Sequence, residues 1–111
     1  MYKRQNLTSW TFVPGSEITF NKAAYAGAKK IYFQANISSD ASDREVYARL
    51  YDATHNIGVQ GSDITTQSVT LLLVQSDNIN PYSGNLNLKI QIKSLNGNTV
   101  TLSNPRIRVV Y

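Results

Sequence analysis

Hydrophobic and polar residues alternate with a period of two along much of the chain, and no stretch sustains the 3.6-residue period of a helix. Successive side chains of a β-strand point to opposite faces, so each alternating segment predicts a strand with one buried and one solvated face. The clearest segments are residues 31–37, 46–51, 86–93 and 106–110. Shorter strands are expected at residues 9–13 and 17–20, on either side of the turn pair Pro14-Gly15.

Turn signals and one apolar run complete this pattern. Asn96-Gly97 predicts a hairpin between a strand ending near Lys93 and one beginning near Thr99, because a type I′ turn needs positive φ at both central positions. Residues 21–29 are the one stretch expected to form a helical turn. Residues 69–75 are apolar on both faces, which predicts a central strand or a strand covered by a partner. In the second case Leu72 and Val74 form an interface.

Short strands spaced by turns predict an all-β protein, in which two antiparallel sheets form a jelly-roll-like β-sandwich. The last strand, over residues 106–111, is expected to complete a sheet near the first. Residues 6–111 contain no linker, repeat or low-complexity tract and are assigned to a single domain.

Composition narrows the classes of function. The chain of 111 residues contains no cysteine, which excludes disulfide frameworks, thiolate nucleophiles and cysteine-ligated zinc. Its formal net charge is +4, but Lys3 and Arg4 supply two of the eleven basic residues, and the rest of the chain has nine basic and seven acidic residues. A balance of +2 does not favour nucleic acid as a partner. No apolar run approaches the roughly 18 residues of a membrane span, so membrane insertion is not expected.

The first five residues, Met-Tyr-Lys-Arg-Gln, resemble the translated end of a transposon adapter used to prepare shotgun sequencing libraries. The resemblance implies that residues 1–5 are an artefact, that the sequence is of metagenomic origin, and that the native polypeptide begins upstream of Asn6. The domain is then expected to be truncated at its N-terminus, and the lack of a signal peptide is uninformative.

Motifs for catalysis and metal binding are lacking. His55, the sole histidine, is expected in a solvated turn and would be the one candidate base for a catalytic triad or dyad. All five aspartates are expected at strand ends or in loops, where this residue commonly binds its own turn. We therefore expect no enzyme and no cofactor. The loop from Asp40 to Asp43 is the candidate for structural calcium, but it lacks the spacing of an EF-hand.

The polar faces of the predicted strands carry the candidate binding residues. Tyrosine, amide and guanidinium groups on neighbouring strands would suit a sugar, or a protein interface. The residues predicted to bind a ligand are Tyr32, Tyr47, Arg49, Tyr51, Gln91 and, in the loop at residues 78–84, Tyr82. Lys89, Lys93, Arg106 and Arg108 also lie on polar faces. The alternative is an ordinary solvated sheet face. Trp10 and Phe12, two residues apart, are both expected to face the core.

One family resemblance follows from the layout of residues 46–54, 59–66 and 88–93 and of the ending around residues 97–109. These segments resemble small jelly-roll modules of phage and bacterial surface proteins, and they are similar in layout to sandwich carbohydrate-binding modules. The resemblance covers most of residues 30–111 and lies in strands and turns, so it is a weak indication of function.

The resemblance implies a non-catalytic module of a virion or cell-surface protein that acts in attachment or self-assembly. Its location would be extracellular or virion-associated. Its partner would be a second copy of the chain, for example in a trimer, or a surface glycan. The alternative is a carbohydrate-binding module that was appended to a larger enzyme.

Overall fold

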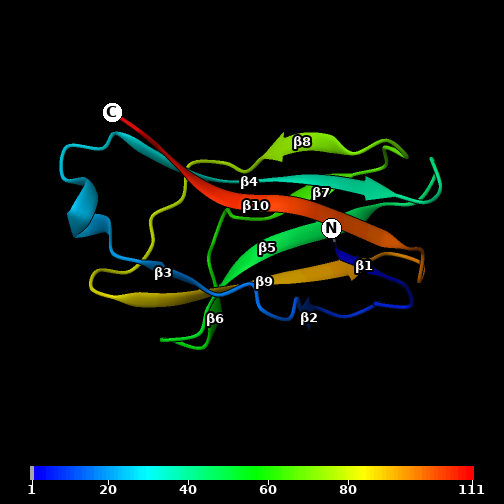
Figure 1. Ribbon diagram of the computed structural model, residues 1–111, viewed down its shortest axis with the longest axis horizontal. Coiled ribbons are helices and arrows are strands. Elements are labelled where there is room, and N and C mark those ends of the chain that lie inside the picture. The colour runs from blue at the N-terminus through cyan, green and yellow to red at the C-terminus, as the bar shows by residue number, and fades with distance from the viewer. Residues whose placement is uncertain (1) are drawn as a thin grey trace.

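Two antiparallel sheets pack face to face in the computed structural model, which describes residues 2–111 (Figure 1). Sheet A has the strand order β1 (Tyr2–Arg4), β10 (Val100–Val110), β4 (Lys30–Ser39) and β8 (Leu72–Gln75). Sheet B has the order β2 (Thr11–Phe12), β9 (Leu86–Ser94), β5 (Val46–Asp52) and β6 (Ile57–Gly58), with β3 (Ile18–Phe20) also paired to β9 and β7 (Ile64–Thr66) to β5. The predicted all-β sandwich is confirmed.

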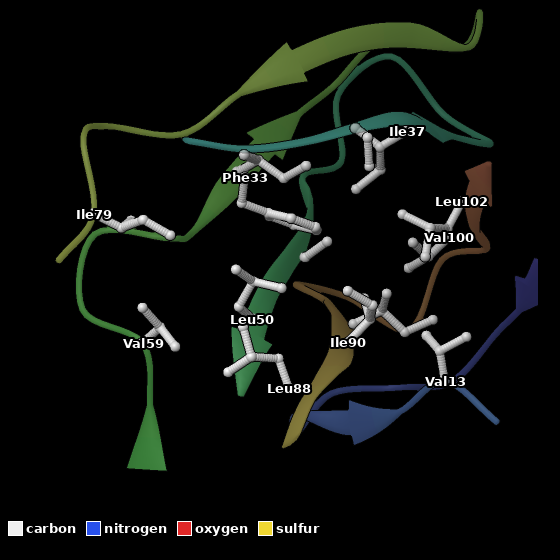
Figure 2. Packing of buried hydrophobic residues seen from close by; sticks show 14 of the residues in the cluster. Val13, Phe33, Ile37, Leu50, Val59, Ile79, Leu88, Ile90, Val100 and Leu102 are labelled. Atoms are coloured by element: carbon white, nitrogen blue, oxygen red, sulfur yellow. The ribbon is translucent and has the colours of Figure 1, made fainter. Parts of the chain in front are cut away.

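The core lies between the sheets and consists mainly of the inward residues of the four longest strands. From sheet A these include Phe33, Ile37 and Val100, and from sheet B Leu50 and Ile90, all fully buried. Figure 2 shows side chains of the two sheets meeting in one cluster. Burial of apolar surface contributes about 25 cal/mol per Å², so this layer is the main source of stability.

The loop that contains Asn96-Gly97 does not form the predicted hairpin. Its flanking strands belong to different sheets, β9 to sheet B and β10 to sheet A. Gly97 has a positive φ of 77°, but Asn96 is not among the residues with positive φ, as a type I′ turn would require. The physical reason is that β9 already pairs with β5 on one side and with β2 and β3 on the other, which leaves no edge for β10.

The end of the chain forms one long strand, β10, where the sequence indicated two separate segments. A register shift between Ser103 and Arg106 divides its pairing with β4, and Asn104 has a φ of 55° at this point. β1 pairs with β10 from Tyr2 to Arg4, so described residues of the predicted adapter segment extend sheet A. Met1 lies outside the described residues. An extended segment of any origin can pair with a sheet edge through its backbone, so this pairing carries no information about where the segment comes from.

Two smaller predictions had different outcomes. The expected helical turn is confirmed as η1 (Lys22–Tyr25), where the Asn21 side chain accepts a hydrogen bond from the backbone N–H of Ala23 at 3.0 Å. The apolar run at residues 69–75 is not a central strand, because β8 lies at the edge of sheet A and pairs with β4 alone among the described strands.

A buried serine completes the pairing of β5 where β6 and β7 leave a gap. β6 pairs with Tyr51 and Asp52, and β7 pairs with residues 46–48. Between these ladders, the Ser62 hydroxyl accepts the backbone N–H of Leu50 at 3.1 Å and donates to the carbonyl of Val59 at 2.6 Å. Ser62 thus supplies the acceptor that a strand would offer to the N–H of Leu50, while the carbonyl of Leu50 accepts the N–H of Val59 at 3.0 Å.

We expect Ser62→Ala to lower the free energy of unfolding by about 1–3 kcal/mol, because the N–H of Leu50 would be buried without an acceptor. Chemical denaturation of the variant and the wild type measures this difference. Ser83→Ala, at an exposed loop residue, is the control and should unfold like the wild type. Equal stability of Ser62→Ala and the control would contradict this role of the hydroxyl.

Candidate functional site

The residues predicted to bind a ligand lie in three separate places. Tyr47, Arg49, Tyr51 and Gln91 come together on the outer face of sheet B, since β5 and β9 are neighbours. Tyr32 lies on the outer face of sheet A, on the opposite side of the sandwich. Tyr82 lies in the loop between β8 and β9. The sequence alone does not give the order of strands, so it could not separate these groups.

The outer face of sheet B carries a continuous group of aromatic and polar side chains, which we call the aromatic–cation face. The register sets Tyr47 opposite Lys93, Arg49 opposite Gln91, and Tyr51 opposite Lys89. Phe12 pairs with Gln91 from the other side of β9. The face consists of Trp10, Phe12, Tyr47, Arg49, Tyr51, Lys89, Gln91 and Lys93.

The placement of Trp10 and Phe12 corrects the expectation that they face the core. Phe12 is 44% exposed, and Trp10 is half-buried against Arg49 and Tyr47 on the outer face. The phase of the strand explains this arrangement. Val13 is buried in the core, so residues 12 and 10, one and three positions before it, point outward. The apolar Val13 could have indicated which side of this segment faces the core. The prediction instead followed the two larger aromatic residues.

Aromatic rings on this face hold its cations in place. The guanidinium carbon Cζ of Arg49 lies 4.3 Å from the centre of the Trp10 ring. The Lys93 ammonium lies 4.9 Å from the same ring and 5.0 Å from the ring of Tyr47. Trp10 meets Tyr47 edge-on at 6.5 Å. Such contacts contribute roughly 0.5–2 kcal/mol each and fix where the positive charges are presented.

Two further contacts, with Gln91 and with Gly58, restrict the position of the Arg49 side chain. Its Nε donates a hydrogen bond to the side-chain amide oxygen Oε1 of Gln91 at 2.8 Å. Its guanidinium also covers Gly58 of β6, where an added Cβ would lie 2.7 Å from NH1 and 2.9 Å from Cζ. The observed position of the guanidinium therefore depends on the missing side chain of Gly58, since an added Cβ would make Arg49 shift. Sequence reasoning did not identify Gly58, Trp10 or Phe12 as part of a site.

The charges on this face are largely unbalanced. Lys89 pairs with Glu17 at 3.8 Å, and its ammonium lies 5.4 Å from the Phe12 ring. The Glu45 carboxylate accepts a hydrogen bond from the Tyr47 hydroxyl. Within residues 2–111, neither Arg49 nor Lys93 forms an ion pair. Arg49 and Lys93 thus present positive charge without a paired carboxylate in the described residues.

The outer face of sheet A is also basic, but its polar groups bind one another. Arg106 donates through Nε to Gln34 at 3.1 Å, and Gln34 donates to Gln75 at 2.6 Å. Arg108 donates to the same Gln75 oxygen at 3.2 Å. Tyr32 lies opposite Arg108 in the register. This chain of hydrogen bonds crosses three strands and uses the donors that a ligand would otherwise meet.

Tyr82 lines a small pocket, and it also contacts His55. Their rings stack at 4.4 Å, and His55 Nδ1 binds the carboxylate of the buried Asp52 at 2.8 Å. The backbone N–H of His55 also donates to Asp52 at 3.0 Å, so this pair closes the turn after β5. Asp52, Ile57, Pro81 and neighbouring residues line a pocket of about 220 Å³. In the described residues, no hydroxyl group binds the histidine ring, as the Ser/His arrangement would require.

The loop proposed for calcium offers few ligands. Asp43 lies 3.9 Å from Arg44, and both side chains are exposed. Among the residues that the structure describes, no group of three or more histidine, aspartate or glutamate side chains is placed to hold a metal ion.

We expect Tyr47 to titrate at unusually high pH. Its hydrogen bond to Glu45, with smaller contributions from burial and from the negative charge of Glu45, raises its pKa above the ordinary 10.0. A pKa raised by folding stabilises the protonated form, so this contribution to stability is complete below about pH 10 and is lost as the pH rises through the folded-state pKa. An NMR titration of the Tyr47 ring measures it. Glu45→Gln should lower this pKa, and an unchanged value would contradict the assignment.

Comparison with known proteins found no matching family model, no matching curated protein and no matching solved structure. Residues 2–111 contain no helix that is long and apolar enough to cross a membrane.

Proposed function

We propose that this chain is a non-catalytic attachment module of a virion or cell-surface protein, and that its aromatic–cation face binds a carbohydrate chain. The observation that carries the proposal is the pair of cations, Arg49 and Lys93, held against the ring of Trp10 without a carboxylate partner in the described residues. Because the ring restrains both side chains, the two charges can be presented to an anionic group in a defined arrangement.

The chemistry of the face suits a sugar polymer. Phe12 and Tyr51 meet edge-on at 5.1 Å and offer apolar surface to the C–H groups of a sugar ring. The guanidinium of Arg49 provides planar donors for hydroxyl groups. Gln91, which the sequence also predicted to bind a ligand, is only 6% exposed and instead holds the guanidinium in place. Because strands rise by about 3.3 Å per residue, Lys89 and Lys93 stand roughly 13 Å apart along β9. The face can therefore contact several units of an extended chain.

The unbalanced charge favours carbohydrates that carry carboxylate or sulfate groups. A guanidinium binds a carboxylate through two parallel hydrogen bonds, which adds directional selectivity to the charge. The face suits nucleobases less well than sugars, because a base would have to stack on an aromatic ring and the guanidinium of Arg49 already covers the Trp10 ring. A carbohydrate-binding module appended to an enzyme would use the same face and would differ in what the rest of the protein does.

We expect the domain to bind an acidic polysaccharide, such as a uronic acid polymer, more tightly than its neutral counterpart. Arg49→Gln should weaken this binding about ten- to a hundredfold, the effect of losing a hydrogen bond between charged groups. Gly58→Ala should weaken it as well, because the added methyl group displaces the guanidinium of Arg49. Isothermal titration calorimetry at low and high salt measures both effects, and salt should reduce the affinity of the wild type.

Arg106→Gln is the matched control, since it removes the same charge from the outer face of sheet A. It should bind like the wild type. An equal loss in Arg49→Gln and Arg106→Gln would show a response to net charge alone and would contradict the proposed site. So would equal affinity for the acidic and neutral polymers, or binding to neither of them.

A further inference from the structure

β8 is a free edge of sheet A. It pairs with β4 on one side, and no described strand pairs with its other side (Figure 1). The hydrogen bond from the Ser76 N–H to the carbonyl of Phe33, at 2.9 Å, identifies which residues face β4. The backbone N–H and C=O groups of successive residues alternate in direction along a strand. The backbone groups of Leu72 and Val74 therefore also bind β4, whereas the backbone groups of Leu71, Leu73 and Gln75 point away from it. These outward donors and acceptors fit an extended strand.

This edge lacks the features that usually keep sheet edges apart. Residues 64–76 contain no charged residue, no proline and no glycine. Leu72 is 51% exposed, Leu73 50% and Val69 58%. Proteins commonly guard an exposed edge with lysine, proline or a bulge, because an apolar edge invites pairing with another chain. An unguarded edge with leucines of this exposure therefore indicates a surface that is covered by a partner.

We infer that β8 pairs with β8 of a second copy of this chain, antiparallel and centred on Leu73. The backbone groups that point outward, at residues 71, 73 and 75, are spaced symmetrically about Leu73. A two-fold axis at Leu73 therefore pairs Leu73 with Leu73 of the second copy, and Leu71 with Gln75 of the second copy. Leu72 and Val74 lie in register with the buried Ile37 and Ala35, and so face the inner side of sheet A. The same axis sets Leu72 opposite Val74 of the second copy and covers the exposed part of Leu72.

Charge distinguishes a second copy from other partners. The opposite edge of sheet A, β1, carries Lys3 and Arg4, and two copies that met there would bring like charges together. An acidic partner would be drawn to that edge, or to Arg106 and Arg108 on the outer face. β8 is neutral and apolar, and it is complementary to a strand of the same kind, which its own copy supplies.

The geometry of such a pair has a functional consequence. An antiparallel pairing within one continuous sheet places the two-fold axis perpendicular to that sheet, so both copies present the same face in the same direction. The aromatic–cation faces of the two copies then lie on one side of the dimer. A polymer or a surface that reaches both is held with an avidity about 10²–10⁴ times the affinity of one site. The dimer itself is independent of the proposed ligand.

Size-exclusion chromatography with light scattering, from micromolar to millimolar protein, tests the inference on the full chain. We expect the mass to rise to twice that of the monomer with increasing concentration. Leu73→Lys should remain monomeric, because it places two ammonium groups side by side on the axis. Leu95→Lys introduces the same change at a residue that is 55% exposed in the loop between β9 and β10, and should dimerise like the wild type.

Hydrogen exchange separates β8 pairing from any other form of association. The amides of Leu71, Leu73 and Gln75 should become protected as the concentration rises, while circular dichroism confirms that each variant is folded. A monomer at all concentrations would overturn the inference. So would a dimer that survives Leu73→Lys, a trimer, or a dimer in which these three amides exchange as fast as in dilute solution. Failure of the dimer with intact binding to acidic polysaccharide would leave the proposed function standing.

Discussion

The structure depends on the antiparallel ladder between β5 and β9. It extends from Val46 opposite Ser94 to Asp52 opposite Leu88, and its inward side chains, such as Leu50 and Ile90, form the sheet B half of the core. The alternate side chains of the same residues form most of the aromatic–cation face. Since one-residue slippage would exchange the two sets, the burial of the core also fixes the order of charges and rings on the outside. Stability and recognition are thus set by one register.

Much of the sandwich follows from the period-two pattern, and the failures have specific causes. The long strands and the outward direction of Tyr47, Arg49, Tyr51 and Gln91 could be predicted, because each sits between buried neighbours. The direction of Trp10 and Phe12 could not, since β2 is two residues long and offers too short a pattern. The hairpin at Asn96-Gly97 failed because a local turn signal says nothing about whether the preceding strand has a free edge.

The two outer faces show how the same residue types acquire different roles. Arginine and glutamine occur on both. On sheet A, Arg106, Gln34 and Gln75 bind one another in a chain, which stabilises a solvated surface. On sheet B, Arg49 makes one bond to Gln91 and otherwise lies against a ring. Lists of residues along the chain cannot separate these cases, because the difference lies in which strands are neighbours.

The space above Gly58 allows the chain to adjust recognition without altering a residue that would contact a ligand. Its backbone is not in the left-handed region, so other small residues are compatible with its conformation, and what they would change is the room left for the Arg49 side chain. A single methyl group there would displace the guanidinium of Arg49 while every donor and ring on the face stayed the same. Related chains could therefore diverge in affinity through a position on a neighbouring edge strand, and a comparison restricted to the aromatic and charged residues would miss the cause.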